Sequence, residues 1–315
     1  MLTPEKRGIS TDSIFDMASL TKVIATTTAA LQMIEAGRIS LSDRVSEIFS
    51  DYSWAGGNTA ATVEDLMTHT SGFAAVYPFN ELPREGFDPV RVISSLHSSL
   101  QKMYEPGRSE VYSDLDYILL GKMVERVSGK RLDDYCMENV FKPLGMRDTC
   151  FNPPASLESR FVATEVYGDR VCLGTVHDEN AYFMDGISGH AGLFSTAADL
   201  KIFSDAILGG GVLGGRRILS TASISQMLRQ RRPGIGGTFG LGWQLNNGGN
   251  AGAFGDLFPV WSFGHTGFTG TMMWMDMKSG LCTILLTNRV HPARDNTAIL
   301  RYRRLFNNIA ASLLL

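Results

Sequence analysis

The sequence predicts an α+β fold on three observations. Residues 19–36 place apolar side chains at helical spacing, and Gly37 follows them at a position where helices commonly end. From about residue 60 to residue 235 the local signals are mostly helical, with Gly and Pro residues between the segments. Beyond residue 235 the apolar period becomes that of strands. Helices and strands are thus segregated along the chain, which indicates the α+β class.

The helical signals of the middle region fall in five segments. They are TVEDLMTHTSG, DPVRVISSLHSSLQKM, LDYILLGKMVERVSGK, LDDYCMENVFKPLGM and STAADLKIFSDAILGGG. After residue 235, TFGLGWQLN and GTMMWMDMKSGLCTILLTNRV predict strands, the second as a hairpin that turns at residues 278–280. The last segment, NTAILRYRRLFNNIAASLLL, predicts an amphipathic helix. We expect a discontinuous α/β sheet domain from residues 1–60 and 236–315, and a mostly helical domain from residues 61–235.

The composition is that of a globular protein that can bury a large core. The chain has 315 residues, of which 44% are hydrophobic and 19% are charged. Its 29 basic residues are outnumbered by 32 acidic ones, so it lacks the basic excess that binding to nucleic acid or to an anionic membrane requires. We expect a small-molecule or peptide substrate.

The cysteines and the first residues carry no targeting or metal-binding pattern. Four cysteines (Cys136, Cys150, Cys172 and Cys282) are scattered without metal-type spacing, which indicates buried free thiols. The segment MLTPEKRGIS has no apolar core of a signal peptide, and no stretch of 18 apolar residues follows. We therefore expect no membrane segment, and a cytoplasmic location for the chain as it stands, or a periplasmic or extracellular one if an upstream segment is removed.

A serine and a lysine one helical turn apart occur twice, in very different surroundings. Ser19 and Lys22 open the apolar segment 19–36, where the free N–H groups of a helix start favour a developing anion. Burial there predicts a lowered pKa for Lys22, which would make its amine a base. Ser99 and Lys102 repeat the spacing in a segment rich in polar and basic residues, which indicates a solvated helix face.

Two further segments, which follow Ser19 and Lys22 along the chain, also carry polar side chains that could take part in a catalytic site. VYSDLDY places Tyr112 and Asp114 two residues apart just before a predicted helix. FGHTGFTG places His265, Thr266 and Gly267 at the expected start of a strand, where the glycine allows a close approach of substrate to the backbone.

Taken in this order, the three motifs resemble those of the serine β-lactamase and penicillin-binding-protein superfamily, which are Ser-x-x-Lys, Tyr-x-Asn and Lys/His-Thr-Gly. The segments FDMASLTKV, DLMTHTSG, PGRSEVYSD, GHAGLFSTAADL and FGHTGFTGT are similar to the class C branch, which includes D-alanyl-D-alanine carboxypeptidases and family VIII esterases. The segment GTVHDENAYFMDGISGHAGLFS resembles the 4B type of penicillin-binding protein. The resemblance implies a transpeptidase-like antiparallel sheet flanked by helices, with the mostly helical region inserted in it.

The resemblance also implies roles for particular residues. Ser19 attacks the substrate carbonyl and forms an acyl-enzyme, while Lys22 and Tyr112 share the proton transfer. Thr266 binds the substrate carboxylate or orients the acyl group. The N–H groups of Ser19 and Phe268 form the oxyanion hole, in which each donor contributes roughly 3–4 kcal/mol. No metal and no cofactor is implied.

Asp114, His265 and Gly267 complete the expected substrate-binding residues. A phenol has a pKa of about 10, so Tyr112 acts as a base only if Lys22, with or without His265, stabilises its phenolate. Asp114 stands where the family usually has Asn, and a carboxylate beside Lys22 favours the charged ammonium. Tyr112 is then the better candidate for the base unless Asp114 points away.

A second departure concerns the short segment before the first motif. Only 18 residues precede Ser19, whereas the family ordinarily carries some tens of residues that form strands there. The family's N-terminal strands are thus expected to be missing, which would leave an open sheet edge and favour a homodimer through it.

The remaining polar residues have simpler interpretations. His69 is expected in a turn packed beneath the site rather than as a base. His177, Asp178, Glu179 and His190 are close in sequence but match no metal-ligand spacing, which favours a loop of the substrate cleft.

The sequence leaves the substrate open among a D-Ala-D-Ala peptide, a β-lactam and an ester. The alternatives to a carboxypeptidase or β-lactamase are a family VIII-type carboxylesterase and a penicillin-binding or sensor module with little turnover. The intact serine and lysine favour an enzyme.

Overall fold

The fold is that of a mixed α+β protein built around a four-stranded antiparallel sheet. The structure is a computed structural model that describes residues 6–54, 60–96, 104–249 and 252–314. The sheet has the strand order β11-β10-β9-β8. Its strands are β8 (Gln244–Leu245), β9 (Phe263–Thr266), β10 (Met272–Met275) and β11 (Cys282–Leu285). The α+β class predicted from the sequence is confirmed.

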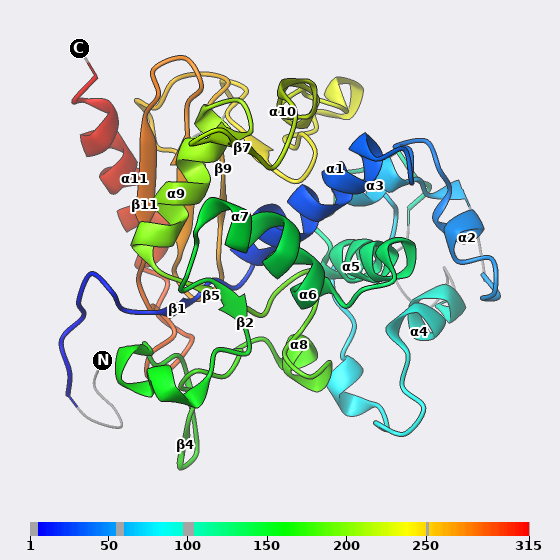
Figure 1. The fold of residues 1–315 in the computed structure, drawn as a ribbon, viewed down its shortest axis with the longest axis horizontal. Coiled ribbons are helices and arrows are strands. Elements are labelled where there is room, and N and C mark those ends of the chain that lie inside the picture. The colour runs from blue at the N-terminus through cyan, green and yellow to red at the C-terminus, as the bar shows by residue number, and fades with distance from the viewer. Residues whose placement is uncertain (1–5, 55–59, 97–103, 250–251, 315) are drawn as a thin grey trace.

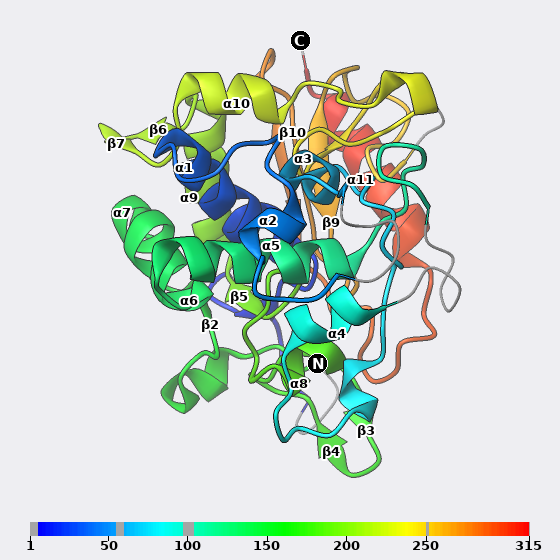
Figure 2. The ribbon, with the colours of Figure 1, turned by 90° about the vertical axis from the view of Figure 1, so that its right-hand side faces the viewer.

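Helices cover both faces of this sheet. The C-terminal helix α11 (Ile299–Ala311) lies against one face, and α9 (Ala197–Leu208) lies against the other (Figures 1 and 2). The four side chains of β10 are all buried between these layers. The predicted closing helix is therefore confirmed, and so is the hairpin, in which Gly280 has a φ of +72° and its N–H donates to the Asp276 carbonyl.

The chain from Val45 to Ile235 supplies most of the helices. Besides α9, those described are α2 (Val45–Ile48), α3 (Val63–Met67), η3 (Phe79–Glu81), α4 (Pro89–Ser95), α5 (Asp114–Ser128), α6 (Leu132–Cys136), η4 (Met137–Phe141), α7 (Lys142–Leu144), η5 (Ala155–Arg160), α8 (Glu179–Phe183), α10 (Thr221–Met227) and η6 (Pro233–Ile235). One main core joins them to the sheet, since Leu120 of α5 and Met273 of β10 belong to the same buried cluster. The division into two domains stays a prediction.

The helix that carries the first motif is confirmed, with one difference in its geometry. It begins as a π-helical segment, η1 (Lys22–Thr27), and continues as α1 (Thr28–Glu35). Gly37 ends it with a φ of +65°. Every residue of η1 is buried. A π-helical stretch is uncommon and is frequently found at functional sites.

Short strand pairs form the rest of the β structure. The strands β1 (Phe15–Asp16), β5 (Leu193–Ser195) and β2 (Cys150–Phe151) make a three-stranded sheet of order β1-β5-β2. Two hairpins are separate from it, β3 (Val166–Tyr167) with β4 (Arg170–Val171), and β6 (Val212–Leu213) with β7 (Arg216–Arg217). β1 leads directly into the first motif.

The prediction that the segment TFGLGWQLN forms a strand is mostly wrong. Only Gln244 and Leu245 form a strand, and the residues before them turn. Gly242 has a φ of +83°, and a Cβ there would lie 2.3 Å from the Thr27 hydroxyl. The glycines of this segment thus serve a turn packed on η1, which apolar composition does not reveal.

The edge of the four-stranded sheet bears on the expected homodimer. β11 is the last strand of the four-stranded sheet, and β1 pairs elsewhere, so the homodimer through this edge stays a prediction.

Among the described residues no helix is both long and apolar enough to span a bilayer. All four cysteines are free, with Cys136 and Cys172 buried and the other two half-buried. The second Ser-x-x-Lys pair, Ser99 and Lys102, lies outside the described residues.

Candidate active site

Ser19 sits at the end of a strained turn between β1 and the helix. Ala18 before it has a φ of +46°, a conformation that residues other than glycine adopt rarely. The Ala18 N–H donates to Asp16 Oδ1 at 2.8 Å, and the other carboxylate oxygen accepts from the His177 N–H at 2.7 Å. Asp16 therefore holds the turn that presents Ser19. The sequence analysis did not single it out, although it lies in the quoted motif FDMASLTKV.

The third motif lies at the end of a strand, not at its start as predicted. β9 ends at Thr266, and Gly267 lies where the chain leaves the sheet. A Cβ on Gly267 would lie 2.5 Å from the Met17 carbonyl and 2.1 Å from the Thr271 hydroxyl. The Thr271 hydroxyl also donates to that carbonyl, at 3.1 Å. The glycine thus allows the strand end to pack on the turn before Ser19, where the sequence analysis expected it to face substrate.

Lys22 is fully buried, and its ammonium has three acceptors. Nζ donates to Ser19 Oγ at 3.0 Å, to Asp114 Oδ1 at 2.7 Å and to the His190 carbonyl at 3.2 Å. Burial by itself lowers the pKa of Lys22, but the Asp114 carboxylate, assisted by Tyr112, more than offsets this and raises it. The predicted lowering is therefore wrong, because Asp114 points at the amine.

Tyr112 lies beside this lysine, with its ring centroid 4.8 Å from Nζ. The residue is 38% exposed, and its hydroxyl interacts with Lys22 and Ser19. Desolvation is the largest influence and raises the pKa of Tyr112, as does Asp114, although Lys22 and Ser19 lower it. The resting residue is thus a neutral phenol in contact with a cation.

His265 is buried and uncharged. Burial, together with the charge of Lys22, lowers the pKa of His265 to about 3. Its Nδ1 lies 2.8 Å from the Thr266 carbonyl, and its ring centroid is 5.8 Å from that of Tyr112. A neutral imidazole offers no positive charge to a phenolate. Of the two residues expected to stabilise the Tyr112 phenolate, only Lys22 therefore carries a charge that does so.

His69 lies beneath the site, as predicted for a turn residue. It has a φ of +57°, is 1% exposed, and its ring centroid is 4.5 Å from that of Tyr112. Its Nδ1 accepts from the Ser113 N–H at 3.1 Å. Burial lowers the pKa of His69 well below its usual range. This side chain supports Tyr112 and the start of α5 as a neutral group.

These residues open into a cavity of about 520 Å³. Within the described part of the chain, the backbone N–H groups of Ser19 and Phe268 donate to no protein atom. Both residues line the cavity, so both N–H groups are available to a ligand oxygen. The structure thus brings together all the residues singled out by the sequence: Ser19, Lys22, Tyr112, Asp114, His265, Thr266, Gly267 and Phe268.

Two arginines that the sequence analysis missed also line this cavity. Arg303 of α11 is 6% exposed, and its guanidinium donates to the carbonyls of Gly267 at 2.6 Å and Thr271 at 2.8 Å. Burial and the neighbouring Arg289 lower the pKa of Arg303 to about 10, which leaves it charged at neutral pH. Among the described residues neither arginine pairs with a carboxylate. Their charge is therefore available to an anion.

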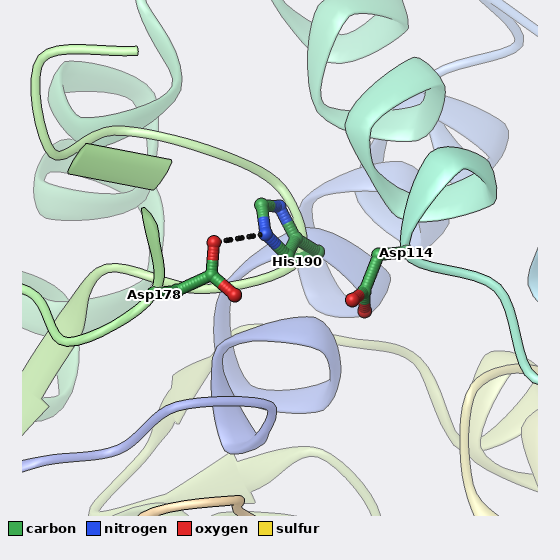
Figure 3. A group of neighbouring side chains, drawn as sticks. All are labelled: Asp114, Asp178 and His190. Atoms are coloured by element: carbon green, nitrogen blue, oxygen red, sulfur yellow. Dashed lines mark hydrogen bonds and ion pairs between the residues drawn. The ribbon is translucent and has the colours of Figure 1, made fainter. Parts of the chain in front are cut away.

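The group formed by Asp114, Asp178 and His190 is the arrangement nearest to a metal centre among the described residues (Figure 3). One potential ligand atom from each lies within 4.8 Å of the others. Asp114 already pairs with Lys22, and His190 Nε2 lies 2.8 Å from Asp178 Oδ1. These residues can hold a cation only in competition with the buried ammonium. The loop that carries His190 thus lies against Lys22, and its expected place in the substrate cleft stays a prediction.

Comparisons with known proteins identify the family to which the chain belongs. A family model named Beta-lactamase matches residues 3–308. A Salmonella agona protein named "Putative D-alanyl-D-alanine carboxypeptidase" is 32% identical over 319 residues, which cover 92% of this chain and 72% of that protein. The chain therefore belongs to the Beta-lactamase family, and with its fold it is a hydrolase of the serine β-lactamase and penicillin-binding-protein type.

Solved structures share the fold. A penicillin-binding protein homologue from Caulobacter crescentus is similar with a TM-score of 0.71 and 20% identity, over 99% of this chain and 86% of that one. EstCE1, described as a hydrolase with promiscuous acyltransferase activity, has a TM-score of 0.68 and 19% identity, over 95% of this chain and 86% of that one.

Proposed function

We propose that the protein is a serine hydrolase of the D-alanyl-D-alanine carboxypeptidase type, in which Ser19 forms an acyl-enzyme. One observation carries the proposal. Ser19 Oγ, 3.0 Å from the Lys22 ammonium, opens into a cavity whose wall holds the uncompensated charges of Arg289 and Arg303. A nucleophile facing two cations suits a substrate whose leaving group ends in a carboxylate.

Tyr112 is the group that accepts the Ser19 proton in this proposal. Lys22 has no free electron pair while Asp114 keeps it protonated, so it stabilises the Tyr112 phenolate by its charge. As Ser19 Oγ bonds to the substrate carbonyl carbon, its proton passes to the phenolate. The phenol then returns a proton to the leaving nitrogen when the C–N bond breaks. Water attacks the ester in the second half of the reaction, with Tyr112 again the base.

The N–H groups of Ser19 and Phe268 stabilise the negative oxygen in both tetrahedral states. Asp16 and Gly267 hold these two groups in place through the contacts of the strained turn. Such preorganised donors cost no rearrangement at the moment when charge develops, which is why each is worth roughly 3–4 kcal/mol.

Turnover of matched peptides tests the proposal. We would measure hydrolysis of Ac-Ala-D-Ala-D-Ala and of its C-terminal amide, alongside nitrocefin and a p-nitrophenyl ester. The free acid should be cleaved at least tenfold faster than the amide, and Arg289→Gln should remove this preference. Arg216→Gln, an exposed arginine of β7, serves as control. Equal rates for acid and amide, or cleavage of the ester alone, would contradict a carboxypeptidase.

The cavity lining favours an esterase as the second candidate. Phe239, Phe268, Ile299 and Leu300 give it an apolar surface beside Ser19, which suits an ester of an apolar acid. The same assay separates the two functions, because an esterase would cleave the p-nitrophenyl ester without a need for Arg289.

A further inference from the structure

A second pocket of about 380 Å³ lies near the catalytic cavity and shares no lining residue with it. Its lining comes from the β3–β4 hairpin, from α8 and from residues in and after η3. These elements lie at the lower end of the ribbon in Figures 1 and 2. Its volume falls in the range of small-ligand sites, which is about 300–1,000 Å³. The Asn180 side chain binds η3 to α8 through the Phe79 N–H at 3.0 Å and the Tyr77 carbonyl at 2.8 Å.

Stacked rings connect the two cavities. The Phe268 ring, at the edge of the catalytic cavity, stacks on His177 with centroids 5.7 Å apart. His177 in turn stacks on Tyr167 at 6.4 Å, and these last two residues line the second pocket. The three rings thus form a wall whose two centroid separations add up to about 12 Å, the greatest length that it can have. An extended chain covers that length with three to four residues, at about 3.3–3.6 Å each.

This wall is fixed relative to the nucleophile. The His177 N–H donates to Asp16, the carboxylate that also holds the turn before Ser19. On the other side, His177 Nε2 lies 2.8 Å from Glu165 Oε2. A group bound in the second pocket is therefore held at a defined distance from Ser19.

The lining of the second pocket combines apolar and cationic groups. Its buried part includes Cys172 and Val176. Two guanidinium groups lie over aromatic rings at its rim: Arg170 over Tyr182 and Arg84 over Phe183, each with its Cζ 5.1 Å from the ring centroid.

Of the charged side chains that line the second pocket, one arginine has no ion-pair partner among the described residues. Glu179 pairs with Arg294 at 2.6 Å, and Arg84 pairs with Asp185 at 3.3 Å. Arg170 forms no ion pair with any described residue, and its contacts are with the Tyr182 ring and hydroxyl. An acidic group on a partly apolar chain therefore complements this pocket.

We propose that the second pocket binds the acyl side of the substrate and recognises, through Arg170, an acidic group three to four residues before the bond that Ser19 attacks. The direction in which the substrate lies across the two cavities rests on the proposed function, in which Arg289 and Arg303 bind the terminal carboxylate of the leaving group. The acyl portion must then extend away from those arginines, and the ring wall beyond Phe268 leads to Arg170.

Two pentapeptides test this proposal. Ac-Glu-Ala-Ala-D-Ala-D-Ala and Ac-Gln-Ala-Ala-D-Ala-D-Ala differ only in the charge four residues before the scissile bond. The glutamyl peptide should have a kcat/KM higher by up to about fivefold, the upper limit for one exposed ion pair. Arg170→Gln should make the two peptides equal without changing turnover of Ac-Ala-D-Ala-D-Ala, and Arg216→Gln should keep the preference.

Equal kcat/KM values for the two pentapeptides with the unaltered protein would overturn the proposal, and so would a preference that survives Arg170→Gln. If neither pentapeptide is cleaved, the proposed function has failed, and the pocket is judged by binding instead. Calorimetry with Ac-Glu-Ala-Ala-D-Ala and its Gln counterpart then makes the same comparison, with an Arg170-dependent preference for Glu as the supporting result and equal affinities as the refuting one.

Discussion

Exchange of Asp114 for Asn removes the carboxylate that pairs with the buried Lys22 ammonium. The lysine side chain is fully buried and Asp114 is 24% exposed, with 2.7 Å between Nζ and Oδ1. Breaking a buried pair in this way costs roughly 3–5 kcal/mol, and the partial exposure of Asp114 favours the lower end. With an unfolding entropy of about 2.1 cal/mol/K per residue, about 3 kcal/mol lowers the Tm of a chain of 315 residues by about 5 °C.

The pH dependence of this effect has a definite sign. Because the folded-state pKa of Lys22 is raised, its contribution to stability is complete below the unfolded-state pKa of about 10.4 and is lost as pH rises through the folded-state value. In the unaltered protein this contribution is therefore constant between about pH 6 and pH 9. In the variant, burial becomes the dominant influence on Lys22 and lowers its pKa, so that a neutral amine forms at lower pH and can act as the base.

Two measurements on Asp114→Asn check this reasoning. Circular dichroism gives the Tm, and kcat/KM for a p-nitrophenyl ester from pH 6 to 9 gives the titration of the base. We expect a lower Tm together with a rate profile shifted to lower pH. Asp116→Asn is the control on the same helix, because burial already raises the pKa of Asp116 well above its usual range and the exchange alters less charge. An unchanged Tm and an unchanged profile in Asp114→Asn would refute the assigned ion pair.

Three further predictions follow from the same geometry. Tyr112→Phe should lose about 10²–10⁴ in kcat with an unchanged Tm, whereas turnover like that of the unaltered protein would mean that Tyr112 is not the base. Since the pKa of Tyr112 is raised, its phenolate fraction grows nearly tenfold per pH unit, and kcat/KM should rise accordingly from pH 6 to 9; a plateau at neutral pH would contradict this. Gly267→Ala should lower both Tm and turnover, because its Cβ would lie 2.5 Å from the Met17 carbonyl, while Gly234→Ala, with no atom within 4 Å, should lower neither.

Local sequence patterns predicted the helices well and the strand boundaries less well. Apolar periodicity and Gly37 located the helix that carries Ser19 and its end. The π-helical start of that helix has no local signal in the sequence. His265 and Thr266 end β9 although we expected them to start a strand, because alternation of side chains identifies a strand but not its first residue.

The polar contacts of the site could be predicted only in part. The order of the motifs grouped Ser19, Lys22 and Tyr112, but the pKa of Lys22 depends on Asp114, 92 residues away, and on its orientation. Arg303 was missed because one arginine in an amphipathic helix carries no sign that its guanidinium is buried. Such long-range contacts are set by packing and leave no local pattern.

Covalent labelling of Ser19 tests the central claim most directly. We would treat the unaltered protein and Ser19→Ala with a fluorophosphonate, measure intact masses and map the modified peptide. The account predicts one adduct, on Ser19, that is absent from Ser19→Ala while the variant keeps its Tm. An adduct of the same mass on Ser19→Ala, or labelling of another residue such as Ser99 in the unaltered protein, would contradict it.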